Sequence, residues 1–213
     1  MANEGPTALE RFVNGILPEN PIYRQLLGLC PTLAVTNNLA AALTMAGATA
    51  FVLFSANLII SGIRHLLQPH LRILVFTLTI APFVTVVDRV LAAYLYQMSK
   101  ELGPYIPLII VNCLIVSRCE ICASKQAPLT ALGDAAGQSL GFALGLASIA
   151  AFRELLGAGS LFGFEILPES IWARWTIMVL PPGAFFALGL LLGLVQWMAL
   201  RRKNKAQHTG RVD

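Results

Sequence analysis

Charged side chains are scarce in this sequence, and their scarcity indicates the class of protein. Asp, Glu, Lys and Arg make up 12% of the 213 residues, whereas apolar residues make up 56% and the mean hydropathy is +0.70. This balance is typical of an integral membrane protein. The net charge of +4 comes from basic residues in loops and near the C-terminus, so we expect membrane lipid, and no nucleic acid, around the chain.

Several functional motifs are missing as well. The sequence contains no Walker loop, no dinucleotide-binding glycine fingerprint and no hydrolytic triad. Its three histidines, His65, His70 and His208, are too scattered for a metal site. Residues 1–20 are polar and lack an apolar stretch of signal-peptide length, so no signal peptide is visible. Binding of NADH and hydrolytic catalysis are therefore not indicated for this chain.

Hydropathy predicts an all-α membrane protein with six transmembrane segments, at 22–36, 39–64, 71–98, 104–118, 128–152 and 176–200. The second, third, fifth and sixth are long enough to cross about 30 Å of hydrocarbon. The first and fourth are shorter and interrupted. Pro31 follows Cys30, and Asn112 precedes Cys113, so we expect both helices to be broken near the bilayer midplane.

The two interrupted segments divide the chain into similar halves. Each half would contain a broken segment with a central cysteine and then two long segments. Three crossings per half make the second half enter from the opposite face, which predicts a 3+3 inverted repeat. The predicted parts are an N-terminal segment 1–21, a first repeat 22–98, an inverted second repeat 99–200 and a basic tail 201–213.

Lysine and arginine residues predict the orientation of the segments. Six crossings put both termini on one side. Lys100, Arg153 and Arg174 fall on the opposite side, and Arg89 lies within the third segment. The remaining Lys and Arg residues all fall on the side of the termini, so both termini are predicted to be cytoplasmic.

Cys30 and Cys113 are the strongest candidates for chemistry. A single buried cysteine is usually a small apolar packing residue. Here two cysteines stand at corresponding positions beside helix breaks, which favours metal ligation. An iron–sulfur cluster needs four ligands, typically thiolates. One chain would therefore supply half of such a site, and a homologous partner would supply the other half.

Two further features remain open from the residues alone. Cys119 and Cys122 form a C-x-x-C pair, which suits a dithiol oxidoreductase or half of a metal site. Asp88 lies next to Arg89 inside the third segment, where ionisable residues often line a polar path. Asp88 is therefore a candidate for an ion path.

Glycines with four-residue spacing mark the fifth and sixth segments: Gly133, Gly137, Gly141 and Gly145, then Gly189 and Gly193. Residues at this spacing share one face of a helix. Small residues there allow helix backbones to approach closely in a membrane. The spacing predicts tight packing against another helix of this chain or against another subunit.

Five stretches of the sequence resemble the E-type subunit of Rnf-type electron transport complexes. They are Leu26–Thr36, Val87–Tyr94, Ile106–Cys113, Arg153–Phe162 and Leu180–Phe185. The resemblance covers nearly the whole chain, and it extends to the related D-type subunit of the sodium-translocating NADH:quinone reductase. The Leu-Pro-Pro-Gly-Ala-Phe run at 180–185 favours the Rnf type.

The resemblance implies a non-autonomous subunit of an ion-translocating ferredoxin:NAD⁺ oxidoreductase in the bacterial inner membrane. In such complexes a [2Fe-2S] cluster lies at the interface with the homologous A-type subunit, and Cys30 and Cys113 match this chain's two ligands. The B-, C-, D- and G-type subunits would be the other partners. Electron transfer through the cluster would be coupled to Na⁺ or H⁺ movement. The isolated chain would have no activity.

Two other functions remain as alternatives. Broken helices in an inverted repeat also build the solute and ion sites of secondary transporters. A membrane dithiol oxidoreductase would use Cys119 and Cys122 instead.

Overall fold

The computed structural model describes residues 8–16, 18–157, 159–161, 164–165 and 180–209. Helices dominate this part of the chain, as predicted, and a pair of two-residue antiparallel strands accompanies them. The main elements are α1 (Ala8–Ile16), α2 (Leu29–Val35), α3 (Leu39–Ile63), α4 (Arg72–Tyr94), α5 (Tyr96–Leu102), α6 (Cys113–Arg118), α7 (Pro128–Gly157), β1 (Ser160–Leu161), β2 (Phe164–Glu165) and α9 (Pro181–Thr209).

Five stretches of the described chain are long and apolar enough to cross a membrane: 39–63, 69–94, 106–123, 128–157 and 181–201. They correspond to five of the six predicted segments, although residues 176–179 of the sixth prediction lie outside the described part. The multi-pass membrane class is therefore confirmed. The sixth crossing, the inverted repeat and the division at 98/99 stay predictions.

The predicted segment 22–36 differs from the structure in detail. Its helical part is α2 alone, which begins at Leu29, and turns occupy the residues before it. Pro31 is the third residue of α2 and does not interrupt it, because the first turn of a helix needs no donor from these backbone nitrogens. The irregular backbone therefore precedes Cys30.

The stretch 106–123 is made of several short pieces. A 3₁₀ turn, Ile106–Ile109, precedes α6, and a π-helical turn, Cys119–Ala123, follows it. Residues 110–112 between the first two pieces are not helical. Asn112 caps α6, because its side-chain oxygen accepts a hydrogen bond from the Leu114 backbone N–H at 3.0 Å. The polar residue beside Cys113 thus starts a new helix.

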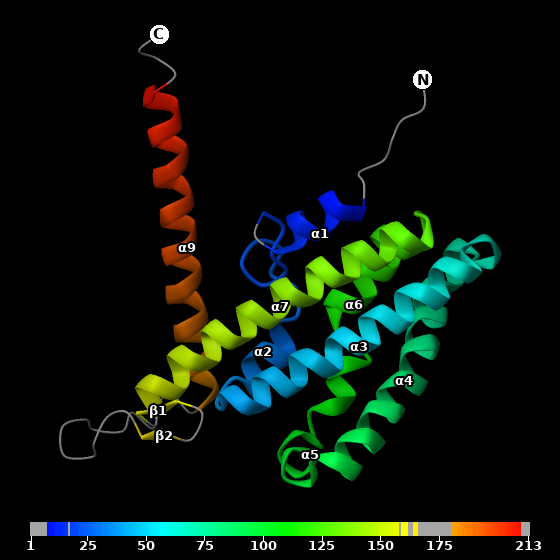
Figure 1. The fold of residues 1–213 in the computed structure, drawn as a ribbon, viewed down its shortest axis with the longest axis horizontal. Coiled ribbons are helices and arrows are strands. Elements are labelled where there is room, and N and C mark those ends of the chain that lie inside the picture. Colours follow the sequence, from blue (N-terminus) through cyan, green and yellow to red (C-terminus); the bar gives the residue numbers. More distant parts are fainter. Residues whose placement is uncertain (1–7, 17, 158, 162–163, 166–179, 210–213) are drawn as a thin grey trace.

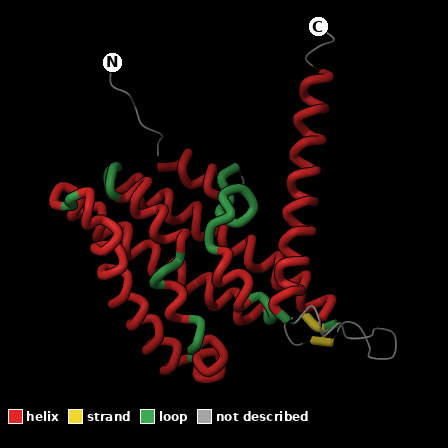
Figure 2. Tube along the Cα trace, turned by 180° about the vertical axis from the view of Figure 1, so that it is seen from behind, coloured by secondary structure: helices red, strands yellow, loops and turns green. Residues whose placement is uncertain are grey.

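Helices α3 and α7 pack along each other in the middle of the molecule (Figure 1). They run antiparallel, since Glu154 near the end of α7 accepts a bond from the Leu39 backbone at 2.8 Å, whereas Ser61 near the end of α3 bonds the Gln126 carbonyl just before α7 at 3.1 Å. Helix α4 packs on α3, and the first part of α9 packs on α7. Figure 2 shows the rest of α9 standing apart from the other helices.

The glycine face of α7 packs against the N-terminal part of the same chain. A methyl group added at Gly137 would lie 2.4 Å from the Phe12 carbonyl oxygen of α1, and one at Gly141 would lie 2.4 Å from the Gly15 carbonyl oxygen. Helix α1 accordingly lies along α7 (Figure 1). The predicted close packing is confirmed and is internal. Gly189 and Gly193 of α9, by contrast, have open space around them.

Gly137→Ala is expected to destabilise the protein by about 2 kcal/mol, because overpacking typically costs about 1–3 kcal/mol and alanine regains about 1 kcal/mol of helix propensity. The contacts at Gly137 are backbone atoms of Phe12 and Arg11, which cannot move aside by changing a rotamer. Gly189→Ala is the matched control and should not lower the melting temperature in detergent. Equal melting temperatures for Gly137→Ala and wild type would contradict the packing described here.

Candidate functional site

Cys30 and Cys113 stand at the starts of two short helices. Cys30 is the second residue of α2 and Cys113 is the first residue of α6. Both thiols are free and exposed at the surface of the chain. Exposure distinguishes them from core packing residues and leaves both sulfur atoms accessible to a ligand or a partner.

A hydrogen bond connects the two cysteine segments. The backbone N–H of Gly28, two residues before Cys30, donates to Sγ of Cys113 at 3.0 Å. Gly28 has φ of +74°, a left-handed conformation that glycine adopts readily. A methyl group there would also lie 2.6 Å from the Phe142 ring, so glycine is required on two grounds. The glycine near Cys30 is evident in the sequence, but its hydrogen bond to Cys113 could not be predicted from it.

A cavity of about 370 Å³ opens beside Cys30, and its lining includes Asn37, Tyr105 and Arg153. Arg153 is 3% exposed, and its guanidinium donates to Thr36 Oγ1 at 2.7 Å. A buried cation therefore lies at the same cavity as Cys30. Sequence reasoning missed this role of Arg153, because 123 residues separate it from Cys30 and no motif joins them.

The C-x-x-C pair is buried. Cys119 and Cys122 lie in the π-helical turn after α6, and both are 0% exposed within the apolar core. Neither forms a disulfide. A dithiol oxidoreductase needs thiols that a substrate can reach, so this burial disfavours that alternative.

Asp88 lies on α4, which carries neither cysteine. Its side chain is half-buried and has no hydrogen bond or ion pair to any residue that the structure describes. It is not among the residues that line the Cys30 cavity. The structure thus does not join Asp88 to the cysteine site, and its part in an ion path stays a prediction.

Two ion pairs occur in the described chain, and they differ greatly in burial. Arg118 and Asp134 lie 3.5 Å apart with side chains 4% and 1% exposed, and Gln25 also accepts a hydrogen bond from Arg118. Arg72 and Glu120 lie 2.9 Å apart at the edge of the molecule, with side chains 28% and 39% exposed. Neither pair includes a sequence-predicted site residue.

No group of three or more His, Cys, Asp or Glu side chains within the described residues could hold a metal ion. The chain therefore offers two neighbouring cysteine segments, and any further ligands of a metal centre at this place would have to come from elsewhere. Two exposed thiols, one of them accepting a backbone hydrogen bond, are suited to sharing a metal centre across an interface.

Comparison with known proteins identifies the family of this chain. Residues 8–192 match the family described as "Rnf-Nqr subunit, membrane protein". The chain is 42% identical to the E subunit of the Na(+)-translocating ferredoxin:NAD(+) oxidoreductase complex of Acetobacterium woodii over 189 residues, which are 89% of this chain and 96% of the relative.

It is also 41% identical to the D subunit of the Na(+)-translocating NADH-quinone reductase of Pseudomonas paraeruginosa, over 95% of this chain and 90% of the relative. The corresponding subunit of Photobacterium profundum is 42% identical over 84% of this chain and 88% of the relative. Both relatives are nearly full-length matches. The family resemblance seen in the sequence is therefore confirmed, and the chain belongs to the Rnf-Nqr family of membrane protein subunits.

Proposed function

We propose that this chain is the E-type subunit of an Rnf complex, an ion-translocating ferredoxin:NAD⁺ oxidoreductase, and that it carries electrons through a [2Fe-2S] cluster shared with the homologous A-type subunit. The observation that carries the proposal is the meeting of the two cysteine segments, where the Gly28 N–H contacts Cys113 Sγ at 3.0 Å. The relatives named above are subunits of oxidoreductases that move Na⁺.

The residues present fit half of such a cluster. Thiolates are the usual ligands of [2Fe-2S] iron, and the exposed Cys30 and Cys113 would provide two of the four. A cluster at this place would take up one electron and pass it on. Cys30 and Cys113 would hold it, and the Gly28 N–H would donate to the Cys113 sulfur.

The charge around Cys30 also suits this role. A thiolate within a membrane is costly unless a cation or metal compensates its charge. Arg153 is buried, donates to Thr36 Oγ1, and lines the Cys30 cavity, where it provides positive charge. The anchoring of Arg153 fixes that charge in place, so it would orient and stabilise an anionic group bound at the cavity.

The order of the helices supports the predicted six-segment inverted repeat. A short helix that begins at or next to a cysteine is followed by two long helices, first as α2, α3 and α4 and again as α6, α7 and α9. The second members, α3 and α7, pack against each other, while each third member packs on its own second member. We infer that the two halves are related in this way and that the breaks before Cys30 and Cys113 lie near the midplane.

We further propose a multi-pass location in the bacterial inner membrane, with both termini cytoplasmic. The first described helix and the end of α9 lie on the same side of the molecule, as an even number of crossings requires (Figure 1). The A-type subunit would be the direct partner, with the B-, C-, D- and G-type subunits completing the complex. The coupled ion would be Na⁺ or H⁺.

The test is iron content and low-temperature EPR of the intact, reduced complex, compared with this chain purified alone. We expect iron and a [2Fe-2S] signal from the complex and little or no iron from the isolated chain, because one chain supplies two of four ligands. A complex that contains every one of these subunit types but no iron would overturn the proposal and favour the secondary transporter. Transport by this chain alone in liposomes would then test that alternative.

A further inference from the structure

Arg89 is a charged residue on the outside of α4 that the proposed function does not use. Val87 and Leu91, each two residues away, are 8% exposed and belong to the apolar core. Two residues correspond to about 200° of rotation around an α-helix. Arg89 is exposed and therefore points almost directly away from the rest of the chain.

The guanidinium of Arg89 has no partner among the described residues. The two ion pairs of the described chain involve other residues, and no hydrogen bond joins Arg89 to the adjacent Asp88. Adjacent residues on a helix project about 100° apart, which keeps the two side chains from pairing. An unpaired cation on an outer face of a membrane-crossing helix is costly, so such residues usually meet an oppositely charged group.

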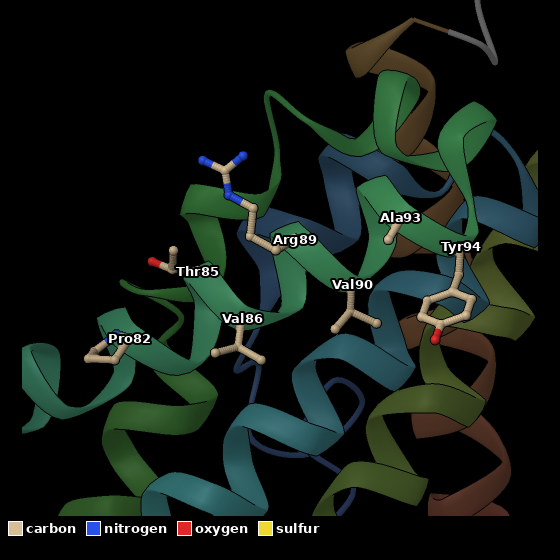
Figure 3. Close-up of a pocket in the computed structure, with 7 residues that line it drawn as sticks. All are labelled: Pro82, Thr85, Val86, Arg89, Val90, Ala93 and Tyr94. Carbon is tan, nitrogen blue, oxygen red and sulfur yellow. The ribbon is translucent and has the colours of Figure 1, made fainter.

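A lipid headgroup is a poor partner for Arg89. The nearer end of α4 is Tyr94, five residues or about 7.5 Å further along the axis. Figure 3 shows the Arg89 side chain leaning toward Thr85, away from that end. Side chains on a helix tilt toward its N-terminus, so Arg89 would have to extend against this tilt to reach the headgroups beyond Tyr94.

Arg89 lies beside two open hollows on the surface of α3 and α4, which together are called the α3–α4 groove here. A hollow of about 520 Å³ is lined by α4 residues that include Pro82, Val86, Arg89, Val90 and Tyr94 (Figure 3). A second hollow of about 270 Å³ between α3 and α4 shares Val86 and Val90 with the first.

The floor of the second hollow contains small residues of α3. Thr44, Gly47 and Ala48 line it, and nothing lies within 4 Å of a methyl group built on Gly47. Small residues that leave open space on a membrane helix allow another helix to approach closely. The two hollows together thus offer an apolar track with one cation at its edge.

We propose that this α3–α4 groove docks a transmembrane helix of a neighbouring subunit that carries an Asp or Glu at the level of Arg89. Charge complementarity identifies the partner, because a carboxylate can accept two parallel hydrogen bonds from a guanidinium and neutralise it within the membrane. The inference requires that the chain works inside a multi-subunit complex. It does not require the [2Fe-2S] cluster.

The first test is photocrosslinking in the intact complex, with a photoreactive phenylalanine analogue in place of Val86. We expect a covalent adduct with another subunit, mapped to a membrane helix that contains an Asp or Glu. The same analogue at Leu74 is the matched control. Leu74 is 62% exposed but lies about 120° around α4 from Val86, so we expect lipid adducts there. Lipid adducts alone at Val86 would overturn the proposal.

The second test measures how much of the crosslinked subunit co-purifies with the Arg89→Met variant. A docked helix predicts a loss of that subunit, whereas exposure of Arg89 to lipid predicts no change. Loss of the cation from a docking site leaves the partner's carboxylate unpaired, and we expect the crosslinked subunit to co-purify at least tenfold less. Neutralising that carboxylate in the same complex should restore co-purification, which a misfolded chain would not allow. Arg89→Lys should retain at least half. If the complex with Arg89→Met keeps the wild-type ratio of subunits, the docking proposal is overturned. If the wild-type complex has no [2Fe-2S] signal, only the proposed function is overturned.

Discussion

Cys113→Ser is expected to abolish the [2Fe-2S] signal of the intact complex while all subunits remain assembled. Cysteine thiolates are the usual ligands of these clusters, and a serine hydroxyl is a weaker ligand for iron, so we expect a cluster with three thiolates to be lost from the purified complex. Cys113 is exposed, so the substitution should cost little folding stability. Cys30→Ser should have the same effect. Iron analysis and low-temperature EPR on the purified complex provide the measurement.

Cys122→Ala is the matched control for these substitutions. Cys122 is buried in the core, and we do not propose it as an iron ligand. Its replacement should keep the signal at wild-type intensity per complex, with at most a modest fall in melting temperature. Unchanged iron and EPR signals in both Cys30→Ser and Cys113→Ser would show that these cysteines do not hold a cluster. Transport measurements would then be the next step.

Asp134→Asn is expected to destabilise the protein by about 3–5 kcal/mol, the usual cost of removing one partner from a buried ion pair. Asp134 and Arg118 are nearly completely buried, and after the substitution Arg118 would have only neutral amide oxygens, those of Gln25 and of the new side chain, as these two partners. An uncompensated guanidinium would then remain inside the helix bundle. Thermal or denaturant unfolding of the purified protein in detergent measures the effect.

Glu120→Gln provides the comparison, because the Arg72–Glu120 pair is partly exposed and such pairs contribute about 0–1 kcal/mol. Replacing both members of the buried pair, as Arg118→Met with Asp134→Leu, should recover most of the stability lost in Asp134→Asn, since no buried charge is left unpaired. Similar losses for Asp134→Asn and Glu120→Gln would contradict the difference in burial.

Hydropathy predicted the long helices closely. The predicted segment 39–64 corresponds to α3 at 39–63, and the predicted segment 128–152 corresponds to the first part of α7 at 128–157. These predictions succeed because an apolar run must be about 20 residues long to cross a bilayer, and length and composition are local properties of a sequence. The family could also be identified from the residues around Cys30 and Cys113.

The prediction was less complete before Cys30. Residues 20–28 are shaped by distant contacts, among them the Asn20 amide, which donates to the Gly141 carbonyl at 2.9 Å. The Asn20 side-chain oxygen also accepts from the Ile22 and Tyr23 backbone N–H groups. Hydropathy does not encode a bond between residues 121 positions apart, so it treated 22–36 as one segment.

Residue order and composition were enough to identify a helical membrane protein of the Rnf-Nqr family and to single out Cys30 and Cys113. The folded chain was needed to learn which residues those cysteines meet: Gly28 at Cys113, and Arg153 at the Cys30 cavity. It was also needed to learn that the glycine face of α7 receives α1 of the same chain. This division arises because composition and spacing specify which surfaces are apolar, small or polar, whereas partners are chosen by the packing of helices far apart in the chain.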